Sequence, residues 1–306
     1  MEQTQHPRSH LDKAQQRLDK AAERVDRVNA KAGRNLPAAI TVGVLLIAWL
    51  ILSLLYFVPG FVAMVVIAAG LGSVELHTAL RTHNRGTSAI VPIVAGGVLA
   101  SIGAYFLAGR PAQDAILLVV APLAIAVAVA LAWRLRGGTE GYVKDVSASL
   151  FTIAYAGLLP LFLTLMVGED RGQLRILATI LCIVASDTGG YIAGVLLGRH
   201  PMAPVISPKK TWEGFGGSIV LAVVIGYLTV HVLLGAPIWA AIVFGLAMVI
   251  TGTLGDLVES MVKRDIGIKD MSGYLPGHGG VLDRVDSIMF SAPMAWLLLY
   301  VLVPHA

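Results

Sequence analysis

Residues 242–262 have the sequence IVFGLAMVITGTLGDLVESMV, an almost entirely apolar run with polar side chains near its C-terminal end. A run of about 20 apolar residues is long enough to cross a bilayer as an α-helix. Asp256, Glu259, Ser260 and Lys263 have the spacing of one helical face. Because ionisable groups inside a membrane span are costly and normally face a bundle interior or a wet cavity, this face predicts a functional site.

A densely polar segment follows, and it leads into the last apolar run of the chain. Residues 260–287 read SMVKRDIGIKDMSGYLPGHGGVLDRVDS. Acidic and basic side chains alternate around a glycine-rich turn in this segment: Asp265, Asp270, Asp283 and Asp286 beside Lys263, Arg264, Lys269 and Arg284. Carboxylates suit hard divalent cations, whereas Lys, Arg and the N–H groups of glycine turns suit phosphates. The segment therefore predicts a site for metal-bound phosphates, and the alternative is a solvated loop.

Composition places the whole chain in the membrane. Of its 306 residues, 56% are hydrophobic and 14% are charged, whereas about a quarter of the residues in a soluble domain are charged. Apolar segments recur at residues 37–55, 59–80, 88–108, 112–133, 146–167, 174–198, 215–235, 237–262 and 286–304. Backbone groups in lipid must be satisfied internally, and no barrel-like alternation is present. We therefore predict an all-α, polytopic integral membrane protein with about nine transmembrane helices.

The distribution of positive charge predicts the orientation. If the N-terminus is cytoplasmic, the segments that face the cytoplasm hold all of the 23 Lys and Arg residues except Arg110, Arg171 and Arg175. Cytoplasmic segments of membrane proteins carry an excess of Lys and Arg. We therefore expect a cytoplasmic N-terminus, and we expect the glycine-rich segment to face the cytoplasm, where nucleotides and Mg²⁺ are present.

Three parts follow from this reading. Residues 1–36 form a charged cytoplasmic tail whose apolar positions allow an amphipathic helix, with a solvated tail as the alternative. Residues 37–172 form an N-terminal transmembrane scaffold of about five helices, and residues 173–306 a C-terminal catalytic part of about four helices. The single cysteine, Cys182, excludes an intramolecular disulfide.

A second polar group interrupts the apolar segments upstream. Residues 186–191 read SDTGGY, and residues 207–214 read SPKKTWEG. Asp187 is a candidate site residue because packing does not need a carboxylate, whereas Gly194 and Gly198 favour a helix-packing seam. The Lys209–Lys210 pair suits a polyphosphate or an anionic lipid head group, and the alternative is a pair of membrane-surface anchors. Glu75, near the inner end of an earlier span, could reach the site, and the favoured alternative is a membrane-edge residue hydrated by head groups.

The segment from Ser260 to Ser287 resembles the signature of phosphatidate cytidylyltransferases, also called CDP-diacylglycerol synthases. Its matching positions are Ser-x-x-Lys-Arg, Lys-Asp, Leu-Pro-Gly-His-Gly-Gly and Asp-Arg-x-Asp. The DTGGY and SPKKTWEG strings are similar to the same family, so the resemblance covers roughly residues 186–287. It implies transfer of CMP from CTP to phosphatidate, giving CDP-diacylglycerol and pyrophosphate, in the cell membrane with the active site on the cytoplasmic side.

The resemblance also implies roles for individual residues. Asp256 and Asp283 would hold Mg²⁺ from two helices, with Asp286 and Asp187 as further ligands; a second cation stays open. Lys263 and Arg264 would act with Asp256 and Asp283 in catalysis. The substrates would be bound by a larger group: Ser207, Lys209, Lys210, Thr211, Lys269, Asp270, His278, Gly279, Gly280 and Arg284. We expect these residues to line a polar pocket at the inner leaflet.

Other functions fit less of the sequence. Another CTP-dependent membrane enzyme, such as a polyprenol kinase or an archaeal-type lipid cytidylyltransferase, is the nearest alternative, because lipid tails are bound by nonspecific apolar surface. A transporter is a further alternative, but the charges cluster toward one membrane face and no repeated halves are evident. There is no P-loop and no HExxH motif. No nucleic-acid partner is expected, and a homodimer stays open.

Overall fold

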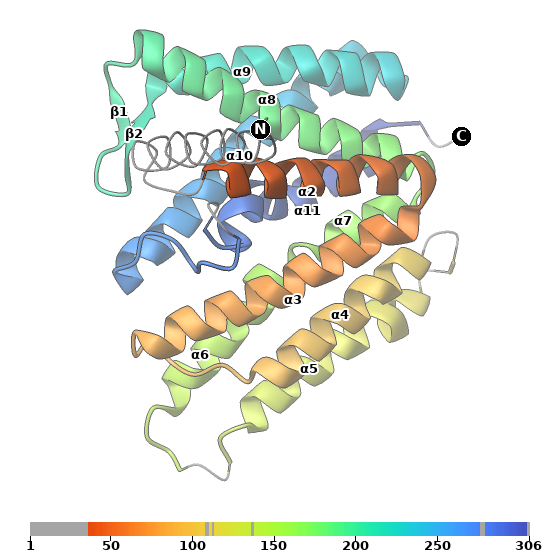
Figure 1. Ribbon diagram of the computed structural model, residues 1–306. Coiled ribbons are helices and arrows are strands. Elements are labelled where there is room, and N and C mark those ends of the chain that lie inside the picture. Colours follow the sequence, from red (N-terminus) through yellow and green to blue (C-terminus); the bar gives the residue numbers. More distant parts are fainter. Residues whose placement is uncertain (1–35, 108–109, 112, 136–137, 276–278, 305–306) are drawn as a thin grey trace, which may run out of the picture.

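A computed structural model describes residues 36–107, 110–111, 113–135, 138–275 and 279–304, and Figure 1 shows that most of this chain is helical. The α-helices are α2 (Leu36–Tyr56), α3 (Val58–Thr82), α4 (Ile90–Phe106), α5 (Ala121–Ala132), α6 (Tyr142–Thr152), α7 (Leu161–Gly168), α8 (Gly172–Leu197), α9 (Trp212–Gly226), α10 (Ile238–Ile266) and α11 (Leu282–Leu302). Three π-helical segments, η1 (Ile116–Val120), η2 (Ile153–Leu158) and η3 (Tyr227–Leu233), adjoin α5, α6 and α9.

The prediction of a helical, multi-spanning membrane protein is confirmed. Six helical segments are long and apolar enough to cross a membrane: Val58–Thr82, Tyr142–Gly168, Gly172–Leu197, Trp212–Leu233, Ile238–Ile266 and Leu282–Leu302. Shorter apolar helices cover Ile40–Tyr56, Ile90–Phe106 and Ile116–Ala132. Each of the predicted apolar segments coincides with one of these helices, while the number of crossings and the orientation stay predictions. The tail over residues 1–35 lies outside the described residues.

The two helices that flank the polar loop are longer than the sequence predicted. α10 continues to Ile266 and ends at Gly267, whose φ of 85° is left-handed and whose N–H bonds to the carbonyls of Lys263 and Arg264. A glycine adopts this conformation without the steric penalty of a Cβ, so it ends the helix. α11 begins at Leu282 rather than at residue 286. The predicted boundaries were therefore wrong at these ends, and the polar side chains lie on helices.

The cytoplasmic loop predicted after α8 contains a β-hairpin, which corrects the all-α assignment locally. Strands β1 (Pro201–Ala203) and β2 (Ser207–Thr211) pair in an antiparallel sheet. The carboxylate of Glu213 accepts the N–H groups of Arg199 and His200 at 3.1 and 3.2 Å, and it thus ties the hairpin to α9. Thr211 caps α9 by accepting the N–H of Gly214 at 3.1 Å. Such short strands have too few residues to show an alternating apolar pattern.

Small residues allow α8 and α9 to run side by side, as seen at the top of Figure 1. A Cβ added at Gly189 would lie 2.4 Å from the carbonyl oxygen of Gly217, so a larger residue would force the helices apart. Gly194, predicted to lie in a packing seam, faces Gly214 in the same contact. The main apolar core lies between α3, α7, α8, α10 and α11.

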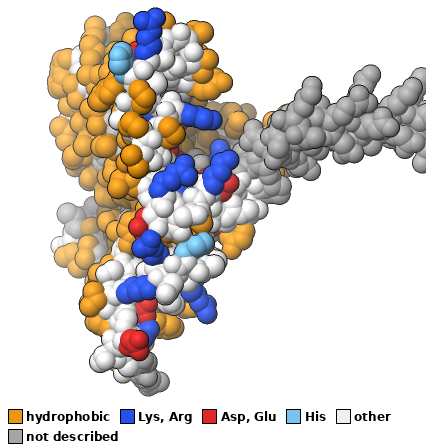
Figure 2. Space-filling view, turned by 90° about the vertical axis from the view of Figure 1, so that its left-hand side faces the viewer, with side chains coloured by type: hydrophobic (Ala, Val, Ile, Leu, Met, Phe, Trp, Pro, Cys, Tyr) orange, Lys and Arg blue, Asp and Glu red, His pale blue; other side chains and the backbone are white. Residues whose placement is uncertain are grey.

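Charged side chains gather on one face of the molecule. Figure 2 shows Lys and Arg residues along the face that carries the β1–β2 hairpin and the C-terminal end of α10, while hydrophobic side chains cover much of the adjoining surface. The polar loop between α10 and α11 emerges at this same end of the bundle. The fold therefore brings both polar segments of the sequence to one end of the helices.

Candidate active site

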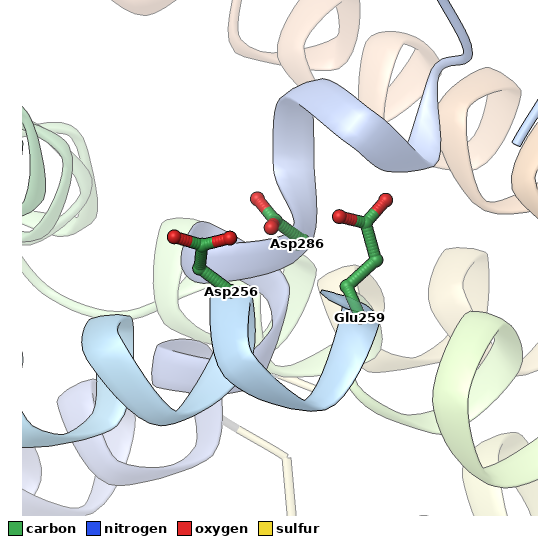
Figure 3. A group of neighbouring side chains, drawn as sticks. All are labelled: Asp256, Glu259 and Asp286. Atoms are coloured by element: carbon green, nitrogen blue, oxygen red, sulfur yellow. The ribbon is translucent and has the colours of Figure 1, made fainter. Parts of the chain in front are cut away.

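Three carboxylates from two helices meet at the centre of the candidate site. Asp256 and Glu259 lie one turn apart on α10, and Asp286 projects toward them from α11 (Figure 3). One oxygen from each of the three lies within 4.8 Å of the others. The helices approach closely here because Gly255 has no side chain: a Cβ at that position would lie 2.7 Å from Cβ of Phe290. This group, Asp256, Glu259 and Asp286, is called the acidic cluster below.

Two members of the acidic cluster are buried and Asp256 is half-buried, and the three carboxyl groups outnumber the ammonium groups of Lys263 and Lys210 beside them. Glu259 is 1% exposed and Asp286 is 9% exposed. The ammonium of Lys263 lies 2.6 Å from Oε2 of Glu259, whereas Oε1 of Glu259 is buried with no hydrogen-bond partner among the described residues. A buried carboxylate oxygen without a partner is costly. Closely spaced carboxylate oxygens are ligands for a hard divalent cation, so the donor set fits Mg²⁺.

Asp283 lies next to the acidic cluster but is bound to other groups. Its Oδ1 is 2.9 Å from the ammonium of Lys263, and its Oδ2 accepts the N–H groups of Met271 and Gly280 at 2.9 and 2.8 Å. Both carboxylate oxygens are therefore engaged by the chain itself. In this arrangement Asp283 orients Lys263 and holds the loop, and its predicted role as a metal ligand stays a prediction.

A polar cavity of about 310 Å³ opens beside the acidic cluster, between α8, β2, α9 and α10. Asp187, Lys209, Lys210, Thr211 and Asp256 are among its lining residues. The Lys210 ammonium lies 2.5 Å from Oδ2 of Asp256 and thus links β2 to the cluster. The fold therefore brings the SDTGGY and SPKKTWEG segments and Asp256 of α10 into one cavity. Its volume is at the lower end of the range for small-molecule sites.

The other predicted residues that the structure describes are not among the lining residues of the polar cavity. Ser207 pairs with Ala203 at the turn of the hairpin and is not among the lining residues of the polar cavity. Arg264, Lys269 and Asp270 are exposed where α10 ends, and a Cβ at Gly279 would lie 3.5 Å from Cβ of Asp270. Arg284 is exposed on α11 and lines a different, apolar cavity. His278 lies outside the described residues.

Two buried acids were not among the residues to which the sequence analysis gave an individual role at the site. Glu259 was placed on the polar face of α10, and its spacing of three from Asp256 was the signal that could have identified it. Glu75 was expected at the hydrated membrane edge, and this expectation was wrong because its side chain is 1% exposed. It accepts hydrogen bonds from Ser272 Oγ at 2.5 Å and from the N–H groups of Val281 and Leu282 at 2.8 and 2.9 Å. The spacing of residues along the chain carries no signal for such a long-range contact.

A helical membrane protein with a partly buried acidic cluster beside a lysine-lined cavity has the features of an enzyme that acts on phosphates at the membrane surface. The chain belongs to the Cytidylyltransferase family, whose family model matches residues 37–302. Curated relatives named phosphatidate cytidylyltransferase include those of Mycobacterium bovis and Mycobacterium leprae. The first is 38% identical and covers 89% of this chain and 91% of its own. The second is 39% identical, and the alignment covers 89% of this chain and 90% of that protein.

A second group of relatives matches only part of the chain. The phosphatidate cytidylyltransferase of Staphylococcus saprophyticus is 40% identical over 156 residues, which are 51% of this chain and 59% of that protein. The mycobacterial relatives, in contrast, align over most of the chain. Membership of the family therefore rests on nearly the whole chain as well as on its C-terminal motifs.

Proposed function

We propose that this protein transfers the CMP moiety of CTP to phosphatidate and releases pyrophosphate, forming CDP-diacylglycerol for phospholipid synthesis. The observation that carries the proposal is the partly buried acidic cluster of Asp256, Glu259 and Asp286 beside a cavity lined by Lys209 and Lys210. Relatives that align over most of the chain are named for this activity. The cluster suits a cation, and the lysines suit the triphosphate of a nucleotide.

The chemistry needs charge neutralisation more than proton transfer. A phosphate oxygen of the lipid attacks the α-phosphorus of CTP and forms a new P–O bond, while the bond from that phosphorus to the bridging oxygen breaks and pyrophosphate leaves. The nucleophile is already anionic, so the main obstacle is to bring two anions together. Lys209 and Lys210 neutralise the nucleotide phosphates, and Lys263, held between Glu259 and Asp283, directs a positive charge to the reacting end.

A divalent cation, Mg²⁺ by preference, would be held by the acidic cluster. Its donor oxygens come from two helices, and Oε1 of Glu259 has no other partner within the described chain. When bound, such an ion supplies Lewis-acid stabilisation of phosphoryl charge. Asp187 lines the same cavity and is a candidate for a further ligand or a second cation. Asp283 contributes by orienting Lys263.

We propose that the chain crosses the cell membrane about nine times with a cytoplasmic N-terminus. Of its 23 Lys and Arg residues, all but Arg110, Arg171 and Arg175 then lie on the cytoplasmic side. The concentration of Lys and Arg on the face of the hairpin in Figure 2 supports this orientation. The site would then open to the cytoplasm, where CTP is available. A homodimer stays a prediction.

The lipid substrate also needs a place for its acyl chains. An apolar cavity of about 350 Å³ lies between α2, α3 and α11, on the side of α11 that carries Val281, Val285 and Ile288. Arg284 is the charged residue in its lining and follows Asp283 directly in the chain. A guanidinium suits a phosphate, and the apolar wall suits an acyl chain. We assign this cavity to an acyl chain of phosphatidate, with the lipid head group near Arg284.

Purified full-length protein in lipid nanodiscs, incubated with phosphatidate and CTP labelled at the α-phosphate, tests the function. The proposal expects label in CDP-diacylglycerol, release of one pyrophosphate for each lipid formed, and loss of both when the divalent cation is chelated. A phosphorylated alcohol with release of CDP, or labelled nucleotide that crosses the membrane without reaction, would contradict it.

A further inference from the structure

A buried carboxylate from the N-terminal half of the chain reaches the loop that leads into α11. Glu75 lies on α3, and all the hydrogen bonds described above come from Ser272, Val281 and Leu282, about 200 residues away in sequence. Within the described part of the chain, no salt bridge to Glu75 is present. The N–H groups of Val281 and Leu282 belong to the start of α11, whose positive dipole end stabilises an acidic group. The contacts of this carboxylate are therefore with the loop and the helix end.

Glu75 and Asp283 hold the two ends of the same loop. Asp283 bonds to Met271 at the first end and to Gly280 at the second. Glu75 bonds to the neighbouring residues at both ends, Ser272 on one side and Val281 and Leu282 on the other. The two carboxylates thus join residues 271–272 to residues 280–282.

Gly280 lies between these two carboxylates. A Cβ at this position would be 2.9 Å from Oε2 of Glu75 and 3.0 Å from Oδ2 of Asp283. Both distances are shorter than ordinary van der Waals contact, so a side chain at this position would require the two carboxylates to shift from the backbone they bind. This packing leaves little freedom for Asp283 to move while Glu75 stays in place.

Lys263 connects the loop-binding Asp283 to the acidic cluster. Asp283 holds the Lys263 ammonium at 2.9 Å, and the same ammonium lies 2.6 Å from Glu259 of the cluster. We propose that Glu75 is a positioning residue that fixes Asp283, and through it Lys263, for the transfer reaction. The inference rests on the proposed function for its effect on catalysis, while its effect on the loop does not depend on that function.

The experiment compares Glu75→Gln with a matched structural control, Asp145→Asn. Asp145 is also a buried acid that holds a loop, because it accepts the N–H of Thr87 at 2.7 Å and pairs with Arg134. Both variants keep the side-chain shape and lose the charge. A glutamine can accept only through one atom, so one of the N–H groups at the start of α11 loses its acceptor. Full-length variants are measured in nanodiscs for kcat, KM for CTP, and thermal unfolding.

We expect Glu75→Gln to lower kcat about 10- to 100-fold, the range seen for residues that orient a catalytic group, with KM for CTP changed less than about twofold. Asp145→Asn should keep kcat within about twofold of the wild type, even if its unfolding temperature falls as far as that of Glu75→Gln. A milder variant, Ser272→Ala, removes one hydrogen bond to Glu75 and should lower kcat less. Equal losses of kcat in the Glu75 and Asp145 variants, or an unchanged kcat in Glu75→Gln, would overturn the inference.

Amide hydrogen exchange over residues 271–282 separates this inference from the proposed function. Loss of the Glu75 charge should speed exchange at Gly280, Val281 and Leu282 in the absence of any substrate, whereas Asp145→Asn should leave it unchanged. Wild-type protein that makes no CDP-diacylglycerol would contradict the proposed function, and the exchange result would still stand. Unchanged exchange in Glu75→Gln would overturn the inference in either case.

Discussion

The ammonium of Lys263 on α10 lies 2.9 Å from the carboxylate of Asp283 on α11, and it also lies 2.6 Å from Glu259. The Asp283 and Glu259 side chains are 3% and 1% exposed, so little water shields these charges. Removing one member of a buried ion pair leaves the other charge without compensation, which is more costly than losing a surface pair. The contact thus joins the two helices that carry the acidic cluster.

Asp283→Asn should abolish most of the turnover, with a loss of at least about 100-fold in kcat, because an amide does not hold Lys263 with a charge. The protein should still insert into the membrane, since the helices keep their apolar faces. The measurement is CDP-diacylglycerol formation alongside size-exclusion chromatography. Asp114→Asn removes the partner of Arg110, whose nitrogen lies 3.7 Å away in a more exposed pair, and is the control. A near-normal kcat in Asp283→Asn would show that turnover does not need the Asp283 carboxylate.

Glu259→Gln should raise the Mg²⁺ concentration needed for half-maximal activity by about tenfold or more, because it replaces a charged oxygen ligand with a neutral amide. Titration of the metal at saturating CTP measures this effect. Glu140→Gln changes an exposed acid on the loop between α5 and α6 and serves as the control. If the Mg²⁺ dependence of Glu259→Gln equals that of the wild type, the acidic cluster does not hold the catalytic ion through this residue.

Lys210→Ala should raise KM for CTP by about tenfold, the cost of a lost charge-assisted hydrogen bond, with a smaller effect on kcat. Lys210 lines the polar cavity and lies 2.5 Å from Asp256, so it connects the nucleotide site to the acidic cluster. Steady-state kinetics with varied CTP measure the change. Lys144→Ala, whose side chain bonds to Asn84, is a matched loss of charge outside the cavity. An equal KM in the two variants would rule out nucleotide binding by Lys210.

Ala68→Trp should fill the apolar cavity and lower kcat/KM for long-chain phosphatidate about tenfold, while activity on dihexanoyl phosphatidate changes little. The short chains of the second lipid do not need the full length of the cavity. Ala63→Trp places the same side chain on an exposed position of α3 and is the control. If Ala68→Trp reduces the two activities in equal proportion, the cavity does not hold an acyl chain of the substrate.

Much of the fold was predictable from the sequence because the bilayer imposes a simple requirement on the chain. The apolar segments had to be helical and about 20 residues long, and the helices of the structure coincide with them. The hairpin that carries Lys209 and Lys210 was not predictable, because it is defined by backbone hydrogen bonds donated to the Glu213 carboxylate and by cross-strand pairing, rather than by apolar periodicity.

The sequence by itself determined the membrane class, the family and the two polar segments that form the site, because hydropathy and motif spacing are properties of neighbouring residues. Only the tertiary structure decided which carboxylates lie next to one another. It grouped Glu259 with Asp256 and Asp286, bound Asp283 to Lys263 and the loop backbone, and brought Glu75 across the bundle. These contacts depend on how closely the helices pack, which small residues such as Gly255 permit and which local spacing does not encode.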